Sequence, residues 1–196
     1  MTTDPFHHDS YTIRRKILTV LGAKFHVFGD DGQLLFFTQQ KAFKLKEDIR
    51  LYASEAMEEA LLVLRARSVI DFGVTFDVVD AVANEVVGSI RRKGLRSLVR
   101  DEWLLFGPGD EPVATVKEDG SALAILRRLH EVMAVIAPQA HHIEVDGLPI
   151  ARFQANRNPF VQRTTVTMLD GAADALDPRL SLAAAILITA IEGRQN

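Results

Sequence analysis

The stretch DPRLSLAAAILITAIEG, which runs from Asp177 to Gly193, predicts a helix that is apolar on every side. Between Leu180 and Ile191 only a serine and a threonine interrupt the plainly apolar side chains. A surface helix has a polar face, whereas a helix that is apolar all round must be enclosed by other parts of the protein. The segment therefore predicts a buried helix and raises the question of what surrounds it.

Both ends of this helix are marked in the sequence. Asp177 is suited to the N-cap, because its carboxylate accepts hydrogen bonds from the free N–H groups of the first turn. Pro178 suits the first helical position, and Gly193 suits the C-terminal cap. The apolar core of about 12 residues would span roughly 18 Å, against about 30 Å of membrane hydrocarbon. The sequence thus favours a buried helix over a membrane anchor, and we expect no membrane span.

The composition is that of an ordinary globular protein. The 196 residues are 47% hydrophobic and 25% charged, with a net charge of −3. We expect one domain over residues 11–193, preceded by a flexible tail of residues 1–10. The absence of cysteine excludes disulfides and thiolate metal sites. The balanced charge argues against a nucleic-acid binder. The N-terminus has no secretory signal pattern, so a cytoplasmic location is the default expectation.

Most of the chain before this helix alternates apolar and polar residues with the period of β-strands. KFHVFG, residues 24–29, is one such run. Turn signals separate the runs, among them Asp31-Gly32 and the segment GPGDEP over residues 107–112. The pattern predicts about twelve strands, joined mainly by short turns. Between residues 121 and 137 apolar side chains recur at helical intervals, which predicts one additional helix.

A closed barrel is the enclosure that a mostly-β chain offers to an apolar helix. A helix with its side chains is about 10–12 Å wide, and a barrel of about twelve strands is wide enough to accept one. Four alanines keep the helix slim, namely Ala183, Ala184, Ala185 and Ala190. We therefore predict a mainly-β fold, a closed antiparallel barrel of about twelve strands around a buried hydrophobic C-terminal helix. Little room would remain inside for a ligand.

Two stretches of the sequence resemble a known group of proteins. They are YTIRRKILTVLGAKFHVFGDDGQLLFF near the start and VTFDVVDAVANEVVGSIRRKGLRSLVRDEWLLFGPGDEPVATVKED in the middle. With the final apolar helix, they resemble the tubby C-terminal-like superfamily, and within it the phospholipid scramblase-like, LURP-one-related branch. The likeness covers Tyr11 to Gly193, and its motifs are persuasive through their order rather than singly. The family fold is a twelve-stranded barrel around a central C-terminal helix.

For function, the resemblance implies an association with membranes rather than a reaction. Tubby-type members bind phosphoinositide head groups through Lys and Arg on the barrel. Scramblase-type members act at membranes, respond to calcium and carry acylated cysteines, and LURP-one-related members have no settled activity. This chain has no cysteine to acylate, so the lipid-anchor part of the scramblase picture does not apply to it.

Basic residues are the predicted binding residues for an anionic head group. They are Arg91, Arg92, Lys93, Arg96 and Arg100 in IRRKGLRSLVR, with Arg14, Arg15 and Lys16 as a second run. Guanidinium groups match phosphate oxygens in bidentate fashion. Successive strand residues point to opposite faces, so Arg91 and Arg92 do not share one patch on a regular strand. The second run extends the surface only if folding brings the two runs together. The alternative is a solvated strand end and loop.

Acidic and histidine residues give weaker signals. Asp170, Asp174 and Asp177 precede the final helix at spacings of four and three, without the closing Glu of an EF-hand, which favours capping over calcium binding. Neighbouring histidines on a strand diverge, and zinc needs about four converging ligands. The pairs His7-His8 and His141-His142 therefore predict no metal site, and we expect no cofactor.

No catalytic arrangement assembles in the sequence. It lacks the G-x-S-x-G, P-loop, G-x-G-x-x-G and H-E-x-x-H patterns. Asp71, Asp77 and Asp80 are interpreted as turn and edge residues, and the single tryptophan, Trp103, as part of the core or the barrel wall. We therefore expect a protein that is not an enzyme.

Two functions remain as hypotheses. The first is a scramblase-like, LURP-one-related barrel at the membrane periphery that binds an anionic phospholipid or a membrane-associated partner through an external basic surface. The second is a protein-interaction or scaffold module that does not bind lipid.

Overall fold

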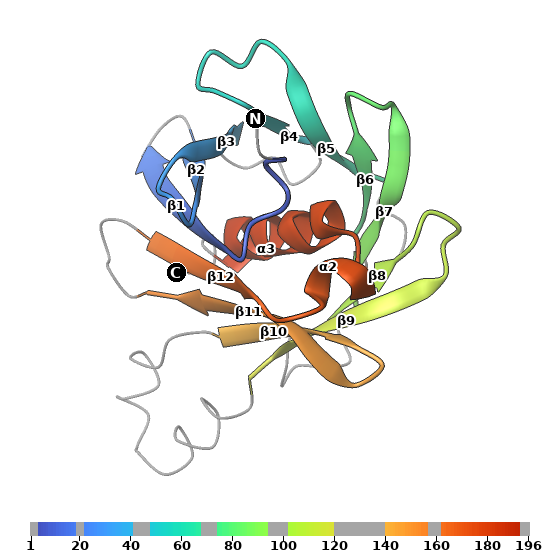
Figure 1. Cartoon of the computed structure of the whole chain (residues 1–196). Helices are drawn as coiled ribbons and strands as arrows, with labels where there is room; N and C mark the ends of the chain where they lie inside the picture. The colour runs from blue at the N-terminus through green and yellow to red at the C-terminus, as the bar shows by residue number, and fades with distance from the viewer. Residues whose placement is uncertain are drawn as a thin grey trace.

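The fold is a closed β-barrel with one helix inside it (Figure 1). The computed structural model of the chain describes residues 4–18, 22–40, 48–67, 74–93, 102–119, 140–156 and 162–192. Among these residues, twelve antiparallel strands close in the order β1-β12-β11-β10-β9-β8-β7-β6-β5-β4-β3-β2. The predicted fold class is thereby confirmed. The helix predicted over 121–137 lies outside the described residues.

Strands that are consecutive in the chain are neighbours in the sheet. They are β1 (Ser10–Leu18), β2 (Gly22–Gly29), β3 (Leu34–Gln40), β4 (Ile49–Tyr52), β5 (Ala60–Ala66), β6 (Thr75–Asp80), β7 (Glu85–Arg92), β8 (Glu102–Phe106), β9 (Pro112–Glu118), β10 (Ala140–Val145), β11 (Leu148–Ala155) and β12 (Gln162–Met168). Two helices follow β12, namely α2 (Ala172–Ala175) and α3 (Pro178–Glu192). The four-residue α2 was not predicted, because one turn of helix leaves no periodic pattern in the sequence.

The interior of the barrel is built by strand alternation. On β1, Tyr11 and Ile13 are fully buried, and on β2 Phe25 and Val27 are buried, with Val27 directly opposite Ile13. The side chains between these positions point outward. One closed sheet therefore gives a single apolar lumen, and the pairing of β1 with β12 completes the ring.

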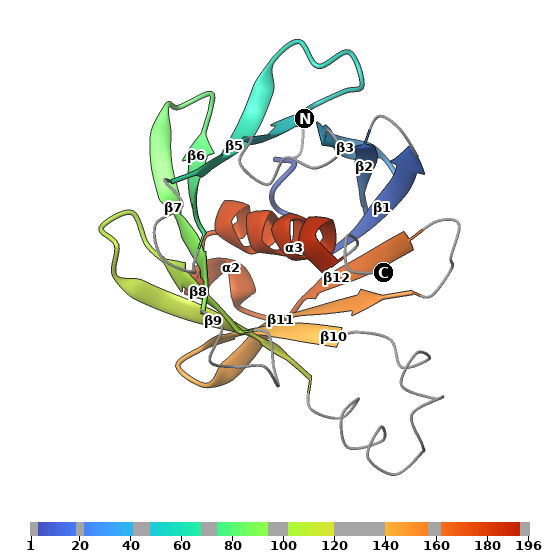
Figure 2. The same cartoon turned by 180° about the vertical axis from the view of Figure 1, so that it is seen from behind.

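Helix α3 fills that lumen. Every residue from Leu180 to Ala190 is buried, and Figure 2 shows the strands around the helix from behind. The two polar residues in this stretch are buried as well. The Thr189 hydroxyl donates to the Ala185 carbonyl oxygen at 2.8 Å and lies 3.3 Å from the Thr164 hydroxyl on β12. Among the described residues, no helix is long and apolar enough to cross a membrane.

The helix passes close to the wall at β7. A Cβ atom added to Gly88 would lie 2.3 Å from the Phe106 carbonyl oxygen on β8 and 3.1 Å from Leu180 Cδ2 on α3. The position between two paired strands and the helix thus has room for glycine only. This contact places the first turn of α3 against β7.

One end of the barrel, which we call the turn end, holds the N-terminus of α3. The turns of the β2–β3, β4–β5, β6–β7, β8–β9 and β10–β11 hairpins meet there, together with residues 169–177 and the segment before β1. Residues 4–9 of that segment, assigned to the predicted tail, contact the barrel. The Phe6 ring lies 4.8 Å from the Phe36 ring, and the Tyr11 hydroxyl donates to the Phe6 carbonyl oxygen at 2.6 Å.

Replacing Tyr11 with phenylalanine is expected to lower the free energy of unfolding by about 1 kcal/mol, because the hydroxyl also accepts a bond from the His8 N–H at 3.2 Å. Burial raises the pKa of Tyr11 to about 12. Because the unfolded value is about 10, the stabilisation is complete below pH 10 and is lost as the pH rises towards 12. Urea unfolding between pH 8 and 11 should show this loss in the native protein and in Tyr52→Phe, but not in Tyr11→Phe. An equal pH dependence in all three would contradict the assignment.

Candidate anion-binding site

The fold places the two predicted basic runs on opposite walls. Arg14, Arg15 and Lys16 lie on β1, and Arg91 and Arg92 end β7, which is six strands away from β1 in either direction round the ring. The fold therefore does not bring the predicted residues onto one external face. Arg96 and Arg100 lie outside the described residues.

Strand alternation also separates neighbours within each run, as the sequence predicts for Arg91 and Arg92. Arg91 is exposed, donates to Thr75 Oγ1 at 3.1 Å and lies over the Phe106 ring at 4.7 Å. Arg92 is half-buried and lies over the ring of Trp103, itself buried in the core. The two guanidinium groups thus belong to different faces of the strand.

Lys93 follows β7 and pairs with the next strand. Its Nζ lies 3.1 Å from Glu102 Oε2, and its N–H donates to the Glu102 carbonyl oxygen. An exposed lysine that is already paired with a carboxylate is a poor starting point for an anion site. The β7 run is therefore less favourable for head-group binding than its five cations suggest.

Arg15 points into the barrel. Its residue is 7% exposed, its Nη1 donates to Gln162 Oε1 at 3.1 Å, and its guanidinium lies 5.9 Å from the Phe25 ring. Gln162 is two residues before Thr164, which contacts α3 near the C-terminal end of that helix. A cation near that end is favourable, because the helix dipole is negative there. Arg15 thus has a structural position, and only Arg14 and Lys16 of this run face outward.

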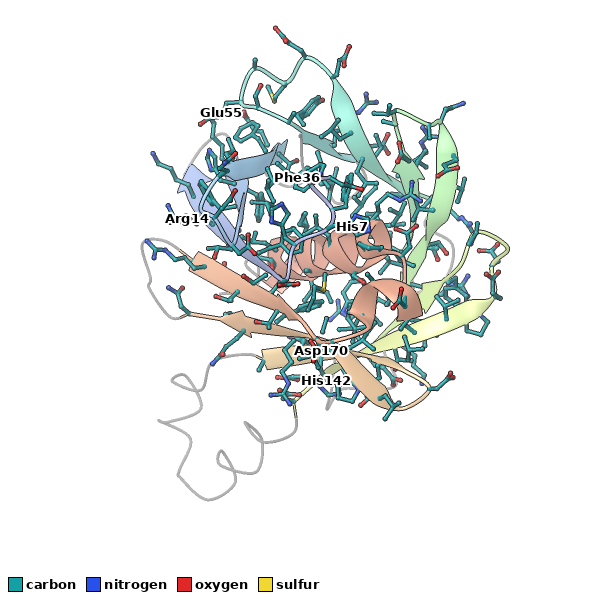
Figure 3. All side chains as sticks on the ribbon, in the orientation of Figure 1. His7, Arg14, Phe36, Glu55, His142 and Asp170 are labelled. Carbon is teal, nitrogen blue, oxygen red and sulfur yellow. The ribbon has the colours of Figure 1, made fainter. Side chains whose placement is uncertain are left out.

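A larger basic face surrounds those two residues. The strands β11, β12, β1 and β2 are consecutive in the ring, and none of them contains Asp or Glu. Their outward-facing cations form what we call the basic wall, which consists of Arg14, Lys16, Lys24, Arg152 and Arg163. Figure 3 shows Arg14 on the outside of the barrel. Among the described residues, no carboxylate forms an ion pair with Arg14, Lys16, Arg152 or Arg163.

The register of the sheet places like charges side by side in the basic wall. Arg14 on β1 is the Cα partner of Arg163 on β12, and Lys16 is the partner of Lys24 on β2. Directly opposed side chains have Cβ atoms about 4.5–5.5 Å apart, and like charges at such positions destabilise a sheet. An anion bound between them would remove that repulsion. Four cations on three adjacent strands thus occupy neighbouring outward positions, which makes this face the candidate for anion binding.

On the β2 side, aromatic rings and the carboxylate of Glu55 border the wall. The Arg14 guanidinium lies over the Phe28 ring at 4.5 Å, and Lys24 Nζ lies 5.6 Å from the Phe37 ring. Glu55 approaches from the β4–β5 turn, with Oε1 3.0 Å from His26 Nε2 and Oε2 3.6 Å from Lys24 Nζ. The hydrogen bond from His26 lowers the pKa of Glu55. Lys24 is thus partly neutralised, whereas the cations on β1, β12 and β11 are not.

The acidic residues before α3 are used in different ways. Asp177 accepts the Arg179 N–H at Oδ1 over 2.9 Å, which is the predicted capping role. Asp170 and Asp174 are exposed. Among the described residues, no group of three His, Asp or Glu side chains is placed to hold a metal ion. His141 is buried and His142 faces outward between Asp119 and Glu144, so this pair diverges.

The predicted turn and edge aspartates take part in separate ion pairs. Asp77 Oδ1 lies 2.6 Å from Arg67 Nε, and Asp80 Oδ2 lies 2.8 Å from Arg179 Nη1. Asp71 lies outside the described residues. Two carboxylates held by different arginines do not form an acid–base pair.

Sequence reasoning missed Lys24, Arg152 and Arg163, because each is an isolated cation in its strand. The sequence signal that could have found them is the absence of carboxylates from particular strands, not a cluster of cations. Four strands, β1, β2, β11 and β12, contain cations but no carboxylate. Their adjacency depends on ring closure between β1 and β12, which local sequence does not reveal.

Comparison with known proteins gives a distant likeness to a solved structure. No family model matches the sequence, and no curated protein matches it. Among solved structures, the chain is similar to an Arabidopsis thaliana protein, AT5G01750, known from an X-ray structure. The two share 14% sequence identity with a TM-score of 0.45, and the match covers 89% of this chain and 92% of the other.

Proposed function

We propose that this protein is a non-enzymatic, scramblase-like barrel of the LURP-one-related type that binds anionic phospholipid head groups at the basic wall. The observation that carries the proposal is the like-charge pairing of Arg14 with Arg163 and of Lys16 with Lys24 on strands that have no carboxylate. A protein that binds no anion would gain stability by losing these pairs. The site would place the protein at the cytoplasmic periphery of a membrane.

The basic wall is suited to binding a membrane surface rather than a ligand enclosed in the barrel. Its cations lie on the outside of four adjacent strands, and α3 occupies the interior. Each Lys or Arg near an anionic membrane surface contributes about 1 kcal/mol. Several such cations give reversible and salt-sensitive binding, because surface charges are screened within about 8 Å at physiological ionic strength.

The experiment compares two pairs of substitutions in vesicle flotation. Arg14→Gln with Arg163→Gln removes two cations from the wall, and Arg91→Gln with Lys93→Gln removes two from the opposite side of the barrel. Vesicles contain phosphatidylcholine with or without phosphatidylserine. We expect the first pair to weaken binding to the anionic vesicles roughly 10- to 30-fold, from about 1 kcal/mol per cation. The second pair should bind as the native protein does.

Each other outcome overturns the proposal. Loss of binding with the second pair alone would transfer the function to the predicted β7 run. Failure of the native protein to bind anionic vesicles would favour the scaffold hypothesis. Competition by soluble inorganic phosphate at the concentration of the lipid head groups would indicate a free anion as the ligand rather than a membrane.

A further inference from the structure

The turn end has a charge pattern opposite to that of the basic wall. Its connecting segments, residues 4–9, 30–33, 53–59, 81–84, 107–111, 146–147 and 169–177, contain no Lys or Arg. They contain thirteen carboxylates, namely Asp4, Asp9, Asp30, Asp31, Glu55, Glu58, Glu59, Asp110, Glu111, Asp146, Asp170, Asp174 and Asp177. The large apolar side chains that are exposed among the described residues also lie at this end, on Met57, Val82, Val86 and Leu148.

Two grooves lie at the turn end, one on each side of Phe6 and His7. Their volumes are about 460 Å³ for the first and about 450 Å³ for the second, which are within the range of ligand sites. The first groove lies between residues 4–7 and the start of α3. The second, which we call the α2 groove, is lined by residues 6–9, 168–174, 176, 178 and 181. Figure 3 shows His7 and Asp170 on the near side of the barrel.

The two grooves differ in how their charges are balanced. In the first groove, Arg179 pairs with Asp177 at 2.7 Å and with Asp80 at 2.8 Å. In the α2 groove, Asp9, Asp170 and Asp174 are exposed and form no ion pair with any residue that the structure describes. Only the α2 groove therefore presents uncompensated negative charge.

A buried imidazole nitrogen belongs to the wall of the same groove. The His8 side chain is 8% exposed, with Nδ1 3.0 Å from Asp30 Oδ1. The hydrogen bond from His8 lowers the pKa of Asp30, so this carboxylate is ionised and accepts the Nδ1 proton. Ring atom Nε2 of His8 is buried and has no hydrogen-bond partner among the described residues. Buried polar atoms are rarely left unpaired in folded proteins. The wall of the groove thus contains a polar atom that the described part of the chain does not satisfy.

The groove also has an apolar part, beside the polar His7 and Ser181. Phe6, Leu169 and Leu176 contribute side chains, and Leu176 and Ala172 are buried beneath the surface. A fitting ligand therefore combines an apolar part with several hydrogen-bond donors and positive charge. Free divalent cations offer no apolar surface, and an anionic lipid would be repelled by the carboxylates.

We propose that the α2 groove docks a basic peptide segment of a partner protein, in which an aliphatic side chain lies next to lysine or arginine. The aliphatic side chain would cover Leu169 and Leu176, while the cations would pair with Asp170, Asp174 and Asp9. Exposed ion pairs contribute little each and are screened by salt, so the interaction is weak and salt-sensitive. It uses a different face from the basic wall, so both sites are free at the same time.

The probe for this site is a dye-labelled peptide of alternating lysine and leucine, titrated by fluorescence anisotropy. Asp170→Asn with Asp174→Asn removes two charges from the groove. Glu58→Gln with Asp146→Asn removes two charges from the same barrel end outside the groove, and asparagine tolerates the positive φ of 51° at position 146. We expect roughly fivefold weaker binding for the first pair and less than about twofold for the second. Arg14→Gln with Arg163→Gln should leave peptide binding unchanged, which separates this site from the lipid site.

Three results would overturn the proposal. Equal weakening by both pairs of acidic substitutions, or equal affinity for a lysine–serine peptide, would mean diffuse attraction to the acidic end. Absence of binding by the native protein at millimolar peptide would remove the site. Calcium alone is titrated by calorimetry into the native protein and into Asp170→Asn with Asp174→Asn. Calcium binding that is present in the native protein and absent in this variant would assign the carboxylates to a metal. Thermal unfolding of each variant shows that it is folded.

Discussion

Replacing Leu187 with alanine is expected to lower the free energy of unfolding by about 2–5 kcal/mol, the range for large-to-small substitutions in a packed core. Leu187 is fully buried on α3 within the ring of strands. The change removes apolar contacts and leaves a cavity. The closed sheet can relax into this cavity only slightly, because each strand is held by two neighbouring strands. Urea denaturation followed by Trp103 fluorescence measures the effect.

The matched control is the same substitution at Leu148, which is 70% exposed at the start of β11. Leu148→Ala is expected to change the free energy of unfolding by less than about 0.5 kcal/mol. Equal effects at the two positions would contradict the enclosure of α3. Because the pairing of Arg14 with Arg163 depends on the closure of the same barrel, that result would also remove the basis for lipid binding.

Replacing Arg179 with methionine is expected to cost about 2 kcal/mol. Its guanidinium joins three carboxylates, with Nη1 2.8 Å from Asp80 Oδ2 and 2.9 Å from Glu85 Oε1, and Nη2 2.7 Å from Asp177 Oδ2. Breaking a fully buried pair costs about 3–5 kcal/mol. The Arg179 side chain is 25% exposed, so solvent screens part of this effect. The three carboxylates that remain would repel one another.

The Arg179 substitution also changes the response to acid. Although partial burial alone would raise the pKa of Asp80, hydrogen bonds from the Ala83 N–H, Arg179 and the Val82 N–H together lower it. The stabilisation is therefore present above the unfolded pKa of about 3.9 and is lost as the pH falls below it. Thermal unfolding between pH 7 and 3 should show a shallower acid dependence in Arg179→Met than in the native protein.

Two further variants test whether the geometry of Arg179 matters. Arg179→Lys should recover only part of the stability, because an ammonium group does not reach three carboxylates in the way a planar guanidinium does. Arg50→Met is the control, since Arg50 is exposed and its nearest carboxylate, Asp48, is 3.9 Å away. A cost at Arg50 equal to that at Arg179 would mean that the cluster adds nothing at the start of α3.

The barrel was predictable because two periodicities in the sequence agree. Alternation in runs such as residues 24–29 and 34–40 indicates strands with one buried face, and Leu180 to Ile191 has no polar face at all. The two patterns together leave a closed sheet around a helix as the simplest arrangement. The prediction needed no knowledge of which strands are neighbours.

The basic wall was not predictable for the opposite reason. Arg14 and Arg163 are far apart in the sequence, and they are neighbours only because β1 pairs with β12. The run from Arg91 to Arg100 has a higher density of cations in the sequence, yet Arg91 and Arg92 face opposite sides of β7. Charge density along a chain is a poor guide to charge density on a barrel, because alternation divides a run between two faces and closure joins distant residues.

The order of elements along the chain has a consequence for biosynthesis. All twelve strands precede α3, and the first strand pairs with the twelfth, so translation delivers the barrel wall before the helix that fills it. Until then, inward side chains such as Phe25, Phe76 and Trp103 have no partner to cover them. Such non-local pairing folds slowly, and exposed apolar surface in a nascent chain promotes aggregation. We therefore expect synthesis of this protein to depend on chaperones that hold the strands until α3 emerges.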